Sequence, residues 1–140
     1  MSTEEQVKGW YLAALMDLRS ARRAVEGEDF PDACFHAQQA AEKALKAFLR
    51  ANNMVPWGHD IEALLSRAHA FGLPAEDLLA RSEDIRMLSE QYMAPRYPNF
   101  RAEMGIELED YTEAFAKRCL KLADEIVRRV RDWLSRRGLI

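Results

Sequence analysis

The 140-residue sequence has little of several residue types, and each shortage excludes a class of protein. It holds only two cysteines, Cys34 and Cys119, which is too few for a disulfide framework. Six glycines and five prolines exclude collagen-like and low-complexity chains. No run of about 18 apolar residues occurs, so we expect no membrane-spanning segment. The N-terminus lacks the basic start and apolar stretch of a signal peptide, and we therefore expect a cytoplasmic protein whose cysteines are buried thiols.

Neither basic nor acidic residues are in large excess. The chain has 20 basic and 23 acidic residues and a net charge of -3, so bulk charge does not indicate a nucleic-acid-binding protein. Any anion-binding surface must be a local patch. With 49% hydrophobic and 31% charged residues, the composition is that of one soluble domain spanning residues 1–140.

Apolar residues recur every three or four positions along most of the chain, which indicates amphipathic helices. The predicted helices run from Val7 to Gly27, from an Asp29 cap to about Asn52, from an Asp60 cap to Gly72, from Pro74 to Pro95 and from Leu108 to Gly138. Two prolines bias the residues before them out of the helical region, so segment 95–101 is expected to be a stiff, non-helical connection. No alternating strand pattern is present. The sequence therefore predicts an all-α fold, an up-and-down antiparallel bundle of four to five helices.

Motifs of common catalytic and metal sites are absent from the sequence. There is no Cys-x-x-Cys, no Glu-x-x-His, no glycine-rich phosphate loop and no Gly-x-Ser-x-Gly. Cys34 and His36 point away from each other on a helix, so they do not form a thiolate and base pair. We therefore expect no metal site, no cofactor and no nucleophilic triad.

One face of the second predicted helix is polar and mostly basic. At 100° per residue, a narrow arc opposite an alanine-rich stripe holds His36, Gln39, Lys43, Lys46 and Arg50. A row of cations could follow phosphates, which makes Gln39, Lys43 and Lys46 candidate nucleotide- or RNA-binding residues. The alternative is a solvated face on which Glu42 and Lys46 form an i, i+4 ion pair.

The proline-containing segment 95–101 offers a second candidate site. Arg96, Tyr97 and Arg101 are candidate binding residues, because arginine can hold a phosphate bidentately and an exposed aromatic ring can stack a base. In the alternative, Tyr97 and Phe100 plug the end of the bundle and both arginines stay solvated.

Arginines also gather near the C-terminus, where they either complement the helix dipole or form a nucleic-acid patch. They are Arg128, Arg129, Arg131, Arg136 and Arg137.

Three elements in this order resemble the HEPN family, named for higher-eukaryote and prokaryote nucleotide-binding domains. They are Gln-Gln-Ala-Ala-Glu-Lys-Ala-Leu-Lys at residues 38–46, His59-Asp60, and Arg96-Tyr97-Pro98. The resemblance extends from about residue 7 to residue 130. It implies a five-helix bundle that is usually a homodimer and is often encoded beside a minimal nucleotidyltransferase.

Many HEPN relatives are ribonucleases whose active site has an arginine and a histidine separated by four to six residues. Arg96 stands where such an arginine is expected, but the positions for the histidine hold Arg101, Ala102 and Glu103. An arginine stabilises charge without transferring protons, and histidine is the side chain best suited to proton transfer near neutral pH. The missing histidine argues against an enzyme.

The sequence leaves three hypotheses for function. The first is a nucleotide- or RNA-binding bundle that forms a homodimer and acts with a nucleotidyltransferase partner in a toxin–antitoxin-like system. The second is a non-catalytic interaction or dimerisation module. The third is a metal-independent ribonuclease in which Arg96 and His59 come together from separate segments or subunits. His59 is thus a candidate binding residue, and its alternative role is to brace the start of the short helix.

Overall fold

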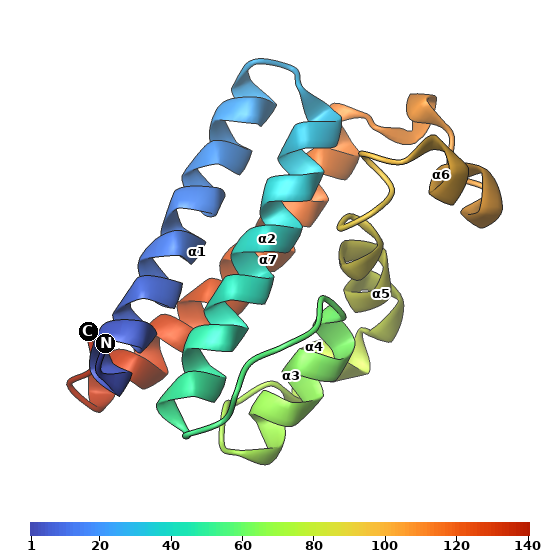
Figure 1. Ribbon diagram of the computed structural model, residues 1–140. Helices are drawn as coiled ribbons and strands as arrows, with labels where there is room; N and C mark the ends of the chain where they lie inside the picture. The colour runs from blue at the N-terminus through green and yellow to red at the C-terminus, as the bar shows by residue number, and fades with distance from the viewer.

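The computed structural model describes residues 1–140 and is entirely helical (Figure 1). Its elements are α1 (Thr3–Glu26), α2 (Phe30–Ala51), α3 (Ile61–Ala70), α4 (Glu76–Ala80), α5 (Ser82–Glu90), α6 (Pro98–Met104), the 3₁₀ helix η1 (Leu108–Asp110) and α7 (Glu113–Arg136). The predicted all-α helical bundle is confirmed. None of the helices is both long enough and apolar enough to cross a lipid bilayer.

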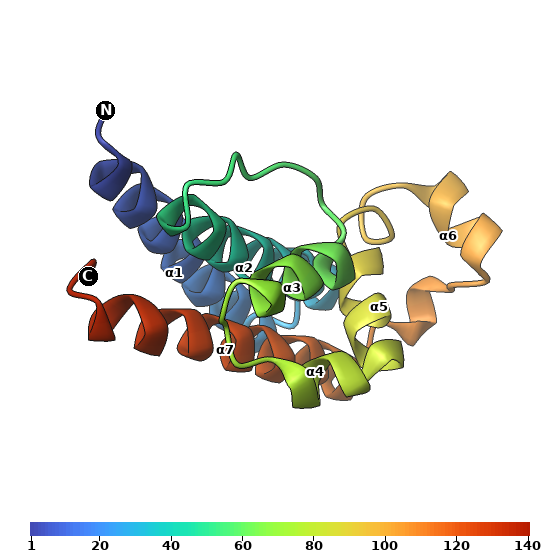
Figure 2. The ribbon, with the colours of Figure 1, turned by 90° about the horizontal axis from the view of Figure 1, so that it is seen from below.

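The three long helices α1, α2 and α7 lie side by side and enclose the core (Figures 1 and 2). On α2, a row of small side chains is fully buried, which allows both neighbouring helices to approach its backbone closely. The row consists of Ala33, Ala37, Ala40, Ala41, Ala44 and Ala47. Phe48 fills the wider end of the same interface, and its ring centroid lies 4.5 Å from that of Trp133 on α7.

Pairs of contacting residues give the directions of these helices. Asp17, late in α1, binds Lys43 of α2, whereas Gln6, early in α1, binds Arg50 near the end of α2. Helices α1 and α2 are therefore antiparallel. Helix α7 runs parallel to α2, because Cys119 near its start contacts Cys34 and its later residue Trp133 contacts Phe48.

The segment 52–60 is the longest connection that contains no helix. It returns along α2, so that the amide of Gln38 donates to the backbone carbonyl of His59 at 3.1 Å. Helix α3 therefore starts beside the middle of α2, where Asp60 caps it by accepting hydrogen bonds from the backbone N–H groups of Glu62 and Ala63. In Figure 2 the segment arches over the outside of the bundle, from the end of α2 to the start of α3.

The chain between residues 74 and 112 differs from the prediction in three places. The single helix expected from Pro74 to Pro95 is interrupted at Arg81, which separates α4 from α5. Segment 95–101 was expected to be non-helical, and this is wrong for its second half. Pro98 occupies the first turn of α6, where the missing N–H has no intrahelical partner. The last helix begins at Glu113 rather than Leu108, because the Thr112 hydroxyl caps it by accepting from the N–H of Phe115.

Arginines near the C-terminus contact residues of the shorter helices and other side chains of α7. Arg129 makes a two-pronged contact with Asp77 at 2.5 and 2.6 Å, and this guanidinium lowers the pKa of Asp77 to about 2. Arg137 lies over the ring of Trp133 at 3.6 Å. Much of this basic group is therefore engaged in ion pairs and cation–π contacts.

We predict that Phe48→Ala destabilises the protein by roughly 3–5 kcal/mol, because it leaves a cavity between α2 and α7 that the alanine row cannot fill. Chemical denaturation followed by circular dichroism measures the change. Val55→Ala is the control, since Val55 is 78% exposed and its truncation should leave the free energy of unfolding nearly unchanged. Equal stability of the two variants would contradict this description of the core.

Candidate functional site

The carboxylate of Glu42 is the centre of a buried polar cluster on α2. It accepts hydrogen bonds from Lys46 Nζ at 3.0 Å, from Gln38 Nε2 at 3.2 Å and from His59 Nδ1 at 3.0 Å. Only 5% of the Glu42 side chain and 8% of the Lys46 side chain are exposed. A buried charge of this kind persists when it is paired and its remaining lone pairs are satisfied, and both conditions hold here.

The Glu42 carboxylate also sets the tautomer and orientation of His59. An ionised carboxylate only accepts hydrogen bonds, so His59 donates from Nδ1; in the neutral imidazole, Nε2 then keeps its lone pair. The imidazole stacks on the ring of Tyr92, with centroids 3.9 Å apart and planes 11° from parallel. Half of the His59 side chain is exposed, which leaves Nε2 accessible to a ligand.

Arg96 lies close to the same tyrosine ring. Its guanidinium carbon is 4.6 Å from the ring centroid of Phe35, 4.9 Å from that of Tyr92 and 5.1 Å from that of Tyr97. Nε and Nη2 donate to the Tyr92 backbone carbonyl at 3.2 and 2.9 Å, while Nη1 donates to no atom of the chain. We name this group the Arg96 cluster: Phe35, His59, Tyr92, Arg96 and Tyr97.

The Arg96 cluster offers groups suited to a phosphate and a base. The three rings and the carbonyl hold Arg96 in one orientation, so less conformational freedom is lost when its free N–H groups bind an anion. Tyr97 is 45% exposed and presents a ring for stacking. Three of the predicted binding residues, His59, Arg96 and Tyr97, are thus brought together from two segments distant in sequence.

The polar row predicted on α2 lies against α1 instead of facing solvent. Lys43 Nζ contacts Asp17 of α1 at 2.5 Å, and the same carboxylate accepts from His36 Nδ1 at 2.8 Å. Gln39 donates to the Gln38 side chain at 2.8 Å. The Glu42–Lys46 ion pair is present as expected, but it is buried rather than solvated. This row lies along the seam with α1, and its lysines already have carboxylate partners.

Arg101 and the aromatic residues of segment 95–101 also have defined places. Arg101 Nη1 donates to the backbone carbonyl of Ala94 at 2.8 Å and that of Pro95 at 3.4 Å, which ties the start of α6 to the preceding turn. Tyr97 is too exposed to plug the bundle. The buried Tyr111 takes that role, and its hydroxyl donates to Gln91 at 2.8 Å.

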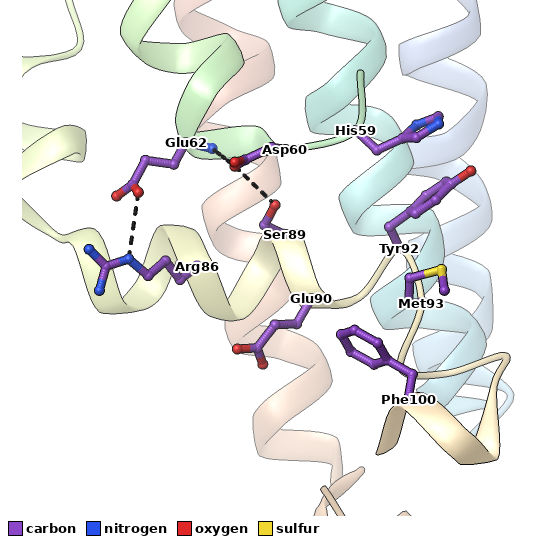
Figure 3. Close-up of a pocket in the computed structure, with 9 residues that line it drawn as sticks. All are labelled: His59, Asp60, Glu62, Arg86, Ser89, Glu90, Tyr92, Met93 and Phe100. Carbon is purple, nitrogen blue, oxygen red and sulfur yellow. Dashed lines mark hydrogen bonds and ion pairs between the residues drawn. The ribbon is translucent and has the colours of Figure 1, made fainter. Parts of the chain in front are cut away.

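A cavity of about 470 Å³ opens beside the Arg96 cluster, between the start of α3, helix α5 and α6 (Figure 3). It is lined by His59, Asp60, Glu62, Arg86, Ser89, Glu90, Tyr92, Met93 and Phe100. The volume falls within the range of roughly 300–1,000 Å³ that is usual for small-molecule sites.

The two cysteines are buried thiols, as expected from the sequence. Cys34 lies beside Cys119, and this neighbouring thiol together with burial raises the pKa of Cys34. A thiol with a raised pKa is a poor nucleophile. No group of three or more His, Cys, Asp or Glu side chains converges as metal ligands would.

Sequence reasoning missed several residues of this site. Tyr92 is four residues before Arg96, a spacing at which side chains meet on one helical face, and this was an available signal. Phe35, Glu42 as the partner of His59, and Glu90 in the cavity come together only through tertiary packing.

Comparisons with known proteins place the chain in a family. Residues 7–133 match the model of the HEPN domain. Over 125 residues, the chain is 32% identical to "Putative toxin MJ1304" of Methanocaldococcus jannaschii, covering 85% of this chain and 82% of that protein.

Two solved structures have the same fold. TT1696 from Thermus thermophilus has a TM-score of 0.74 and 33% identity, and the match covers 91% of this chain and 97% of that one. ST0689, described as an archaeal HEPN homologue, has a TM-score of 0.71 and 35% identity over the same shares, 91% and 97%. With the family model matching most of its length, this chain belongs to the HEPN domain family.

Proposed function

We propose that this HEPN protein binds a nucleotide or an RNA strand at the Arg96 cluster. The observation that carries the proposal is the position of the Arg96 guanidinium, held among three aromatic rings with free N–H groups, next to an imidazole stacked on one of those rings. An arginine fork for phosphate and an exposed ring for a base are the groups that proteins use to hold single-stranded nucleic acid.

The proposed cellular role is that of a toxin-like component in a two-component, toxin–antitoxin-like system. The similarity to a protein named a toxin supports this role. Within it, we propose that the chain forms a homodimer and that its partner is a minimal nucleotidyltransferase, as the resemblance to the family implies.

We predict that Arg96→Ala weakens binding of mononucleotides and short RNA by roughly tenfold or more, because a charge-assisted hydrogen bond to phosphate is lost. Fluorescence anisotropy with a labelled single-stranded RNA measures the change at a fixed salt concentration.

Arg136→Ala is the matched control for this prediction. It removes an exposed arginine at the far end of α7, and it should leave the affinity nearly unchanged. Loss of binding in the Arg136 variant, with full binding in the Arg96 variant, would move the site to the basic end of α7 and contradict the proposal.

Helix α1 offers the surface that supports a homodimer. Leu12 is 57% exposed, Leu15 36% and Met16 64%, and their spacing puts them on one face of the helix. We predict a dimer by multi-angle light scattering and a monomer for a Leu12→Glu, Met16→Glu double variant. A monomeric wild-type protein would contradict the homodimer, and dimerisation without any nucleotide binding would favour the interaction-module hypothesis.

Metal-independent RNA cleavage is a second candidate function, and one observation favours it. A neutral His59 that donates to Glu42 from Nδ1 keeps Nε2 as a proton acceptor, and its ring stacks on Tyr92, the residue that Arg96 also contacts. The cluster therefore holds both a base and an anion-stabilising group. In this case His59 replaces the histidine that is missing after Arg96.

If the cluster cleaves RNA, we predict that cleavage persists in EDTA and falls by roughly 10²-fold or more in His59→Ala, as is typical for loss of a general base. His69→Ala serves as the control, because His69 lies at the other end of α3 and contacts the Leu73 carbonyl. Intact RNA after prolonged incubation with wild-type protein would exclude the candidate and leave the binding function in place.

A further inference from the structure

The cavity beside the Arg96 cluster has an apolar wall and an unusual set of carboxylates. Met93 and Phe100 supply apolar surface, and Phe100 forms no aromatic pair within the chain. Glu90 and Phe100 both line the cavity, and their side chains are drawn in Figure 3. A flat, partly apolar ligand that stacks on Phe100 can therefore reach Glu90 with its edge.

Three carboxylates line the cavity, and two of them are already engaged. Asp60 caps α3 and lies within 3.5 Å of the Ser89 hydroxyl, while Glu62 pairs with Arg86 at 3.5 Å. The Glu90 side chain makes no hydrogen bond or ion pair with the chain, although it is half-buried. Burial raises the pKa of Glu90, because nothing in the protein offsets the desolvation of its charge. A ligand that donates hydrogen bonds to Glu90 would offset the cost of desolvating its charge.

An ionised carboxylate can bind the hydrogen-bonding edge of only some nucleic-acid bases. Its two oxygens only accept hydrogen bonds, so the partner must present two adjacent donors. Guanine does so with its N1–H and its 2-amino group. Adenine and cytosine place a ring-nitrogen acceptor beside their amino group, and uracil places carbonyl oxygens on both sides of its N–H, so each would set an acceptor against the carboxylate.

We infer that this cavity binds a guanine base, with Phe100 stacking on its face and Glu90 accepting from its N1–H and 2-amino groups. The inference rests on the proposed function, since it names the base that accompanies the phosphate at the Arg96 cluster. Three carboxylates against one arginine, Arg86, make the cavity negatively charged, which disfavours phosphate there; the phosphate is therefore placed at Arg96 and the uncharged base in the cavity.

Calorimetric titration of the full chain with GMP, IMP, AMP, UMP and guanosine tests this inference near neutral pH. GMP should bind roughly tenfold or more tightly than AMP or UMP, since a hydrogen bond to a charged group contributes about that factor. IMP, which lacks the 2-amino group, should lie between them. Glu90→Gln should abolish the preference for GMP over AMP, because an amide offers one acceptor and one donor in place of two acceptors.

Glu83→Gln is the matched control, because Glu83 is an exposed carboxylate on the same helix, α5, and lies outside the cavity. It should keep the full preference for GMP. Thermal unfolding followed by circular dichroism shows whether each variant is folded, and a Glu90→Asp variant replaces Glu90→Gln if the latter fails to fold. In that variant the shorter carboxylate should reduce the preference for GMP.

The outcomes separate this inference from the proposed function. Equal affinities for all four nucleotides that fall together in Arg96→Ala would overturn guanine recognition and leave nucleotide binding at the cluster intact. GMP binding that depends on Glu90 but not on Arg96 would support the base site and contradict the phosphate role of Arg96. A preference for GMP that is unchanged in Glu90→Gln would overturn the inference, and absence of binding by every ligand would overturn both.

Discussion

The hydrogen bonds to the buried carboxylate of Glu42 hold together the parts of the molecule on which the candidate site depends. Lys46, on the same helix, donates to this carboxylate and balances its charge. Gln38 donates both to the carboxylate and to the backbone carbonyl of His59, and the His59 ring donates to the carboxylate from Nδ1. Removing one partner from a buried ion pair typically costs about 3–5 kcal/mol, so this arrangement is strongly coupled to the fold. The extended segment 52–60 has no helix of its own, and these contacts keep it against α2.

From this anchor, the geometry of the site follows in order. Because His59 is oriented by Glu42, its ring stacks on Tyr92, and Arg96 approaches the same ring and the Tyr92 carbonyl. Tyr92 contacts the Arg96 guanidinium and also lines the cavity that contains Glu90, so a cation and a carboxylate both lie near this residue. A ligand with an anionic end and an uncharged, donor-rich ring would match this arrangement, and we therefore propose a nucleotide rather than a simple anion.

The periodicity of apolar residues was sufficient to predict the bundle, the long helices and their approximate ends, because burial of one helical face dominates their formation. It was insufficient for segment 74–112, where short helices depend on local caps such as Thr112 and on the tolerance of Pro98 in a first turn.

Arg96, Tyr97 and His59 could be selected from their chemistry and from the family resemblance. Their convergence on Tyr92 could not, because it depends on how segment 52–60 returns along α2. The polar row on α2 was recognisable, but the carboxylates that neutralise Lys43 and Lys46 became clear only from the packing of α1 and from the burial of Glu42.

Nuclear magnetic resonance of the histidine side-chain nitrogens tests most directly whether the Glu42-oriented His59 belongs to a ligand site. In the free protein, long-range proton–nitrogen correlations should show His59 with its proton on Nδ1. When a mononucleotide is added, the His59 Nε2 and Arg96 Nε signals should shift with saturation, while the signals of His69, near the far end of α3, should stay in place. A neutral His59 with its proton on Nε2 in the free protein, or His59 and Arg96 signals that do not move at saturating nucleotide, would contradict the account.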